Sequence, residues 1–223
     1  MKPLLTSTAL FLLVIGFSGV VSGQDTLVDF EETKRLAERG FAASQTLLGV
    51  MYYLGEGVPE NKAEAARWYR LAAEQGDVNA QYELGTMYLN GEGVPENDAE
   101  AARWWLLAAE QGDVSAQHNL GLMYRNGEGV PENDAEAARW WLLAVKQGHA
   151  NGQYNLGVMY FDGEGVPQNN VRAYMWWSVA AAQGNESART NRDITSERLT
   201  PDQLARGQDM ATRCFESDYQ VCE

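Results

Sequence analysis

The chain has 223 residues, of which 45% are hydrophobic and 22% are charged, and its formal net charge is −14. This composition is ordinary for a globular protein and excludes an intrinsically disordered chain. Because so acidic a surface repels phosphate groups, we expect no nucleic acid as a partner and no attraction to anionic lipid headgroups.

Residues 1–23 have the pattern of a secretory signal peptide. Lys2 precedes a stretch without charge that ends at Gly23, and its apolar centre, Ala9–Phe17, is short for a span of the bilayer. Val21 and Gly23 fit the small-residue pattern before a cleavage site. We therefore expect export, to a periplasm or out of the cell, with no integral membrane segment after cleavage. An uncleaved N-terminal anchor is the alternative.

The rest of the sequence repeats with a period of 36 residues. Internal repetition at this period is typical of a solenoid of small units. The segment GEGVP marks the period, and it begins at Gly55, Gly91, Gly127 and Gly163. The predicted parts are an N-terminal capping half-repeat (24–41), four repeats (42–77, 78–113, 114–149 and 150–185), and C-terminal capping helices with a tail (186–223).

The first helix of each unit is predicted from its apolar spacing, which the second unit illustrates. Gly91 ends this helix, because glycine adopts the left-handed backbone of a helix C-terminus at little steric cost. Gly93 and Pro95 then prevent an immediate restart. The residues that share one face of this helix are Ala80, Leu84, Met87 and Tyr88.

The second helix of the unit begins at a polar cap and carries tryptophan. Asn97 and Glu100 have the spacing of a capping box, and Gly112 ends the helix. Its apolar face consists of Ala101, Trp104, Trp105 and Ala108. Stripes at this spacing are typical of a core. All seven tryptophans of the chain lie at two adjacent positions of successive second helices: Trp68, Trp104, Trp105, Trp140, Trp141, Trp176 and Trp177.

The GEGVP loop has three possible interpretations. A phosphate loop is excluded, because a helix precedes the segment and no Lys-Ser/Thr pair follows it. A calcium loop is the sharper alternative, but calcium needs about six to eight oxygens at one point and each loop offers one glutamate. We therefore interpret the loop as a turn and expect no metal and no cofactor. The equivalent loop glutamates are Glu56, Glu92, Glu128 and Glu164.

Both ends of the solenoid carry expected capping helices. A polar helix within Asp29–Arg39 is expected to make its apolar contacts through Phe30, Leu36 and Phe41. Near the C-terminus, Thr200, Pro201 and Gln203 have the pattern of a capped helix start. The narrow apolar stripe that follows consists of Leu204, Ala211 and either Cys214 or Phe215.

The only two cysteines, Cys214 and Cys222, lie close together near the C-terminus. In an exported protein such a pair is expected to form a local disulfide, because the compartment is oxidising. Two free buried thiols are the alternative.

The segment AQYELGTMYLNGEGVPENDAEAARWWLLAAEQGD resembles the Sel-one-like repeat, a relative of the tetratricopeptide repeat. The pattern recurs four times over residues 42–185 with small losses, such as Gly152 in place of the first alanine. The resemblance implies an all-α, right-handed superhelical solenoid of helix-loop-helix units, whose first helices line a concave side. Members of this family are mostly adaptor or scaffold proteins, and many are exported by bacteria.

A hydrolase is the alternative function that the resemblance raises. One exported, cysteine-rich branch of the family is linked to penicillin binding and β-lactamase activity. Its paired cysteines are missing from residues 42–185, and the motifs Ser-x-x-Lys and His-Glu-x-x-His are missing too. The two histidines, His118 and His149, lie in different helix regions and are expected to be surface or packing residues. We therefore expect no enzyme activity.

Comparison of the four units separates constant from variable positions in the first helix. Five residues recur in every unit, as Gln81, Leu84, Gly85, Met87 and Tyr88 do in the second. We expect the recurring positions to pack neighbouring units. Three positions on one helix face vary instead: Thr46, Tyr82, His118 and Tyr154; Val50, Thr86, Leu122 and Val158; Tyr53, Leu89, Arg125 and Phe161.

The variable positions are free of that packing constraint and carry many large side chains, which are typical anchors for a protein or peptide partner. Two alternatives stay open: these side chains fill gaps between units, or the chain is a fixed scaffold in an envelope complex. The candidate partner-binding residues, named here the variable face, are Tyr53, Tyr82, Leu89, His118, Leu122, Arg125, Tyr154 and Phe161.

Overall fold

The computed structural model describes residues 29–222, so the signal peptide predicted for residues 1–23 lies outside it. Within this range the chain forms helices and no strands. Nor does any of these helices combine the length and the apolarity that a bilayer span requires. The helices are α1 (Phe30–Glu38), α2 (Ala42–Leu54), α3 (Lys62–Ala73), α4 (Val78–Asn90), α5 (Asp98–Glu110), α6 (Val114–Asn126), α7 (Asp134–Val145), α8 (Ala150–Asp162), α9 (Asn170–Ala182), α10 (Glu186–Ser196) and α11 (Pro201–Glu216).

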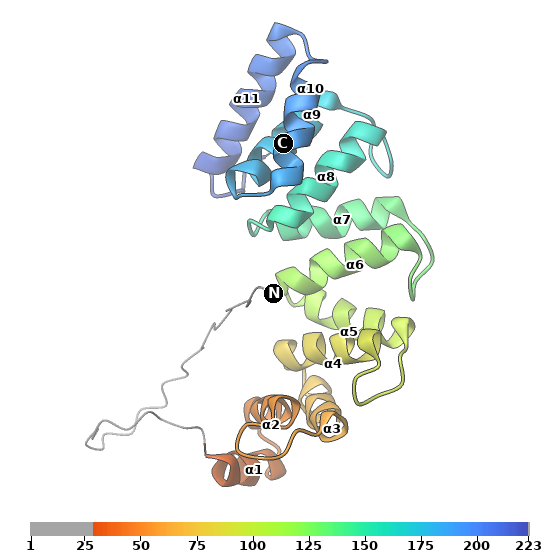
Figure 1. Cartoon of the computed structure of the whole chain (residues 1–223), viewed down its shortest axis with the longest axis vertical. Helices are drawn as coiled ribbons and strands as arrows, with labels where there is room; N and C mark the ends of the chain where they lie inside the picture. The colour runs from red at the N-terminus through yellow and green to blue at the C-terminus, as the bar shows by residue number, and fades with distance from the viewer. Residues whose placement is uncertain (1–28, 223) are drawn as a thin grey trace, which may run out of the picture.

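The helices stack in chain order along one long axis, as Figure 1 shows. From α1 to α10, helices that are consecutive in the sequence pack against one another, whereas α11 folds back onto α9. Each unit therefore contributes one first helix (α2, α4, α6, α8) and one second helix (α3, α5, α7, α9). The expected all-α solenoid of helix-loop-helix units is confirmed.

Each first helix ends at the first glycine of GEGVP, as the sequence predicts. Gly91 has φ 66°, in the left-handed region, and its N–H donates to the Met87 carbonyl. The second glycine has a different role, because a Cβ at Gly93 would overlap the backbone carbonyl of Lys62 in the preceding unit. Gly129 and Gly165 meet the preceding unit in the same way. The loop is thus a close contact between units as well as a turn.

The second helices begin at asparagine caps, but the predicted capping box is wrong. The Asn97 side chain accepts from the Glu100 N–H at 3.1 Å, which is half of the box. The other half is absent, because the Asn97 N–H already donates to the Tyr88 carbonyl at 2.9 Å. The Glu100 carboxylate instead pairs with Arg103 at 3.0 Å. A complete capping box forms at the start of α11, between Thr200 and Gln203.

Both tryptophan positions of the second helices are buried, which confirms their assignment to the core. The second position packs directly on the first helix of its own unit. The Trp141 Nε1 donates to the His118 carbonyl at 3.0 Å, and a Cβ at Gly121 would overlap the indole ring. The recurring glycine of the first helix is therefore required by the close approach of this aromatic ring.

A ladder of glutamines crosses the interior from unit to unit. The buried Gln81 donates through Nε2 to the Ala73 carbonyl of the preceding unit at 3.1 Å. Its Oε1 accepts from Gln111, at the end of its own unit, at 2.8 Å. Because both bonds satisfy buried atoms of Gln81, they fix how its unit sits on the preceding one, whereas the equivalent Nε2 of Gln153 is buried without a hydrogen-bond partner among the described residues. The members of this glutamine ladder are Gln45, Gln75, Gln81, Gln111, Gln117, Gln147, Gln153 and Gln183.

The N-terminal helix α1 caps the stack by a different set of contacts than expected. Thr33 and Ala37 are its buried residues, and Phe30 packs edge-on against Tyr52 with ring centroids 5.8 Å apart. The expectation that Phe41 is an apolar contact is wrong, since it is 51% exposed. Phe41 is the N-cap residue of α2, and its ring lies under the Arg39 guanidinium at the surface.

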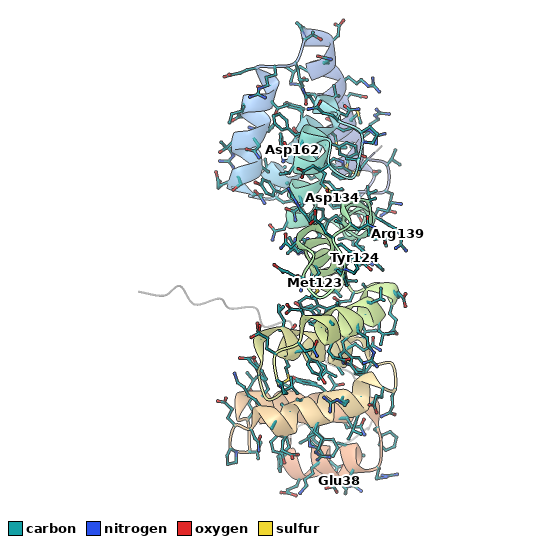
Figure 2. The ribbon with its side chains drawn as sticks, turned by 90° about the vertical axis from the view of Figure 1, so that its right-hand side faces the viewer. Glu38, Met123, Tyr124, Asp134, Arg139 and Asp162 are labelled. Carbon is teal, nitrogen blue, oxygen red and sulfur yellow. A yellow bond between two sulfur atoms is a disulfide. The ribbon has the colours of Figure 1, made fainter. Side chains whose placement is uncertain are left out.

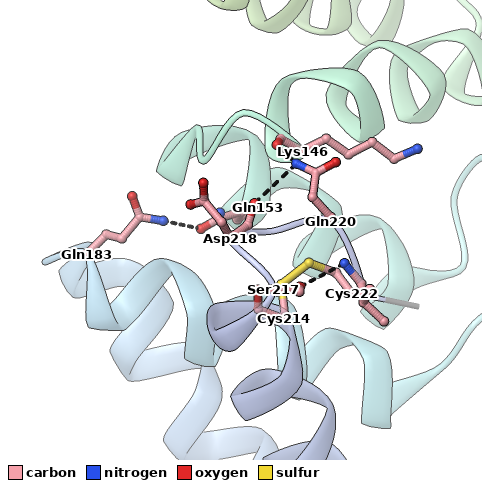
Figure 3. The surroundings of a disulfide bond; sticks show 9 residues. Lys146, Gln153, Gln183, Cys214, Ser217, Asp218, Gln220 and Cys222 are labelled. Carbon is pink, nitrogen blue, oxygen red and sulfur yellow. Dashed lines mark hydrogen bonds between the residues drawn. A yellow bond between two sulfur atoms is a disulfide. The ribbon is translucent and has the colours of Figure 1, made fainter.

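The C-terminal helix α11 closes the opposite end. Cys214, rather than Phe215, completes its buried stripe, which also contains Gly207 and Met210. The structure joins Cys214 to Cys222 in a disulfide, so neither thiol is free. Figure 3 shows the tail returning from this bond toward α7, where the Gln220 Nε2 donates to the Lys146 carbonyl at 3.0 Å.

Candidate functional site

The eight residues of the variable face lie on the first helices α2, α4, α6 and α8, and all of them are half-buried. The expectation that these positions are free of packing is therefore wrong in part. Part of each side chain is buried against the protein, and only the rest of its surface is exposed to solvent. The sequence comparison could not show this, because a residue that varies between units can still touch the constant residues of its neighbours.

Two hollows lie along the variable face. The first, named the α4–α6 hollow, has a volume of about 190 Å³ and opens between two first helices. It is lined by Tyr82, Thr86, Leu89, Trp105, Asn119, Leu122, Met123 and Glu128. The second, named the α8–α10 hollow, has a volume of about 360 Å³. It is lined by Tyr154, Val158, Phe161, Asp162, Trp177, Asn191, Ile194, Thr195 and Arg198.

Indole rings of the core form part of the wall in each hollow. Tyr82 stacks on Trp105 with ring centroids 6.2 Å apart, and Phe161 lies 5.5 Å from Trp177. Because the Nε1 of each indole donates to a first-helix carbonyl, at 3.1 Å, the exposed aromatic edges have a rigid support. The Arg198 guanidinium from the α10–α11 connection also lies over the Phe161 ring, at 5.2 Å.

Two of the four loop glutamates, Glu92 and Glu164, connect neighbouring units. Glu92 pairs with Lys62 at 2.6 Å and accepts from the Tyr53 hydroxyl at 2.6 Å. These two hydrogen bonds, with Lys62 the stronger cause, lower the pKa of Glu92, while the bond to Glu92 raises the pKa of Tyr53. Glu164 pairs with Arg125 at 3.2 Å. Within residues 29–222, no group of three or more potential ligands converges for a metal.

The structure brings the two histidines together, which the sequence analysis missed. The rings of His118 and His149 lie 4.5 Å apart, at the junction of the third and fourth units. The signal was positional: His149 is the N-cap residue of the next first helix, α8, where the Gly152 N–H donates to its Nδ1, and α8 follows α6, which carries His118. Burial, assisted by the neighbouring His149, lowers the pKa of His118 to about 4, and burial also lowers the pKa of His149.

Acidification is expected to destabilise the protein through His118. Its pKa is about 4 in the folded state and 6.5 in the unfolded reference. Between these values the unfolded state binds more protons, so the free energy of unfolding should fall by about 1–3 kcal/mol as the pH drops from 7 toward 4. Urea denaturation at a series of pH values measures this slope. His118→Tyr, the residue of units 2 and 4 at this position, should flatten the slope, and an unchanged slope would contradict the assignment.

Comparisons with known proteins agree with this geometry. Residues 42–77, 78–113, 114–149 and 150–185 each match the Sel1 repeat family. The solved structure of c5321, a protective antigen of uropathogenic Escherichia coli with an SLR fold, superposes with a TM-score of 0.69 at 44% identity over 72% of this chain and 34% of that one. A Sel1 repeat protein from Oxalobacter formigenes gives a TM-score of 0.64 at 34% identity, over 71% of this chain and 63% of that one. The chain thus spans about a third of the first relative and less than two thirds of the second, and no match was found among curated proteins.

Proposed function

The chain belongs to the Sel1 repeat family, and we propose that it is a protein-binding module that holds a protein or peptide partner against the variable face. The observation that carries this proposal is the pair of hollows, each lined by aromatic side chains of the variable face and backed by a core indole. Large aromatic side chains in partly buried, rigid surroundings are the usual anchors of protein interfaces.

Export of the protein is part of the same proposal. The Cys214–Cys222 disulfide supports it, because such bonds persist in oxidising compartments. The signal-peptide pattern of residues 1–23 supports it independently. We propose that the partner is met in a periplasm or outside the cell.

The hydrolase alternative gains no support from the geometry. His118 and His149 contact each other, and the Asn155 amide lies 3.3 Å from the His118 Nε2. Both cysteines of the chain are joined in the terminal disulfide, so neither offers a thiolate. We therefore propose a binding role without catalysis.

The test replaces three anchors, Tyr82, Tyr154 and Phe161, with alanine, singly and together. Because each is half-buried, we expect each single loss of stability to stay near 1 kcal/mol, below the cost of a core truncation. Binding of a partner captured with the purified chain should weaken by about 2 kcal/mol or more at a true anchor. One melting curve and one titration per variant separate the two effects.

Leu107→Ala is the matched control, because Leu107 is an apolar residue of α5, 36% exposed, that lies outside the variable face. It should leave binding unchanged. A stable triple variant that binds its partner as well as the original chain would contradict the proposal. A triple variant that unfolds would favour the alternative in which these side chains fill gaps between units.

A further inference from the structure

The contacts between loops and preceding units follow one rule at two of the three junctions. At the first junction, Glu92 of the second unit meets Lys62 of the first. At the third junction, Glu164 of the fourth unit meets Arg125 of the third. In both cases a cation from the preceding unit neutralises a loop carboxylate that would otherwise face solvent.

The middle junction breaks this rule. The position that holds Tyr53 in the first unit and Arg125 in the third holds Leu89 in the second, and the position of Lys62 holds Asp98. Glu128 accepts a hydrogen bond from the Asn126 amide at 3.3 Å, but no cation pairs with it in the described part of the chain. Glu128 also lines the α4–α6 hollow.

Within residues 78–134, no lysine or unpaired arginine is left to supply the missing cation. Arg103 and Arg125 are the only arginines among residues 78–134, which contain no lysine. Arg103 is paired with Glu100 at 3.0 Å, and Arg125 with Glu164 at 3.2 Å. The middle of the solenoid is therefore strongly acidic, and an incoming positive charge is attracted there.

The same place offers an apolar contact. Tyr82 and Leu89 of α4 and Leu122 of α6 line the hollow, and Met123 lies among its walls. Figure 2 shows Met123 near the middle of the long axis, between Glu38 toward one end and Asp162 toward the other. The hollow is thus an apolar recess with one carboxylate at its edge, in the centre of the variable face.

We propose that the α4–α6 hollow recognises a basic peptide segment, in which an apolar side chain enters the recess and an adjacent arginine or lysine pairs with Glu128. At the other two junctions, Lys62 and Arg125 of this chain provide the cation. At the middle junction, the partner provides it. This inference rests on the proposed binding function and adds the chemistry of the partner. An ion pair beside an apolar wall is stronger than one in open water, because the local dielectric is lower.

The experiment uses an octapeptide library in which each position is fixed in turn, screened on the purified chain. We expect enrichment of arginine or lysine next to leucine or phenylalanine. The best peptide is then titrated against variants. Glu128→Gln should weaken its binding by about tenfold or more, because a charge-assisted bond becomes a neutral one. Glu164→Gln is the matched control, since Glu164 is already paired with Arg125, and it should change binding by less than about twofold.

A second variant, Leu89→Arg, tests the same inference from within the chain. Arginine is the residue of the third unit at this position (Arg125), so the new side chain should enter the recess and pair with Glu128. Peptide binding should then be abolished without a lower melting temperature. A library without basic preference, or equal affinity in Glu128→Gln, would overturn this inference. If Glu128→Gln had no effect but Tyr82→Ala still abolished the binding of the selected peptide, the proposed function would stand and the basic preference would fall. Recovery of no peptide of any composition would also overturn the inference.

Discussion

Replacing Trp141 with alanine is expected to lower the free energy of unfolding by about 3–5 kcal/mol. The indole is fully buried, its Nε1 donates to the His118 carbonyl at 3.0 Å, and its ring packs on α6 at Gly121. Truncation removes this contact area and leaves a cavity between α6 and α7. The two helices cannot close it, because each is also held by its neighbours in the stack. Urea denaturation followed by far-ultraviolet circular dichroism measures the loss without relying on tryptophan fluorescence.

Trp141→Tyr is the matched control for this prediction. The first unit carries Tyr69 at the equivalent position, against the equivalent Gly49, so the site accommodates a tyrosine ring in this same chain. Tyrosine refills most of the lost volume and should retain most of the stability. Equal losses for the alanine and tyrosine variants would show that cavity formation is not the cause.

Gly93→Ala is expected to lower the free energy of unfolding by about 2–4 kcal/mol, because two costs add at this position. Gly93 has φ 70°, where any residue with a Cβ is strained. In addition, the new methyl group would overlap the carbonyl of Lys62 and lie 2.7 Å from the backbone nitrogen of Ala63. Backbone atoms cannot rotate away as a side chain can, so the two units must move apart. Thermal and urea denaturation both report the change.

Gly91→Ala separates the two costs. Gly91 has φ 66°, but a Cβ there would come no closer than 3.4 Å to another atom, the Cβ of Glu96. This variant should lose only the conformational component, about 1–2 kcal/mol. The difference between the two variants then measures the contact between units. Similar losses at both glycines would contradict the close approach at Gly93.

Much of the fold follows from local signals that the sequence repeats. The left-handed Gly91 and the cap at Asn97 act within a few residues, so the C-terminal end of α4 and the start of α5 were predicted closely. Because the sequence repeats every 36 residues, the helices predicted for one unit could be assigned to the other units, which gives a solenoid. The capping box at Glu100 failed for a non-local reason, since the carbonyl of Tyr88 had already taken the Asn97 N–H.

The site was less predictable, because its contacts join different units. Recurrence identified Gln81 as a packing residue, but not the Ala73 carbonyl as its partner. The variable residue Tyr82 was expected to be free, and the core indole of Trp105 supports it. The approach of His118 to His149 depends on how far each unit rotates relative to the last, which spacing along one chain does not encode.

The glutamine ladder makes the number of units adjustable over evolutionary time. Gln81 and Gln117 form equivalent bonds with equivalent atoms one unit back, so deleting or duplicating 36 residues in register restores the same interior bonds. Residues 90–113 and 126–149 are nearly identical, so the loss or gain of one unit in register would keep the same junction between neighbours. The terminal pieces, among them α1 and the disulfide-closed α11, lie outside the repeating units. Natural selection can therefore change the length of the variable face by whole units while leaving both ends intact.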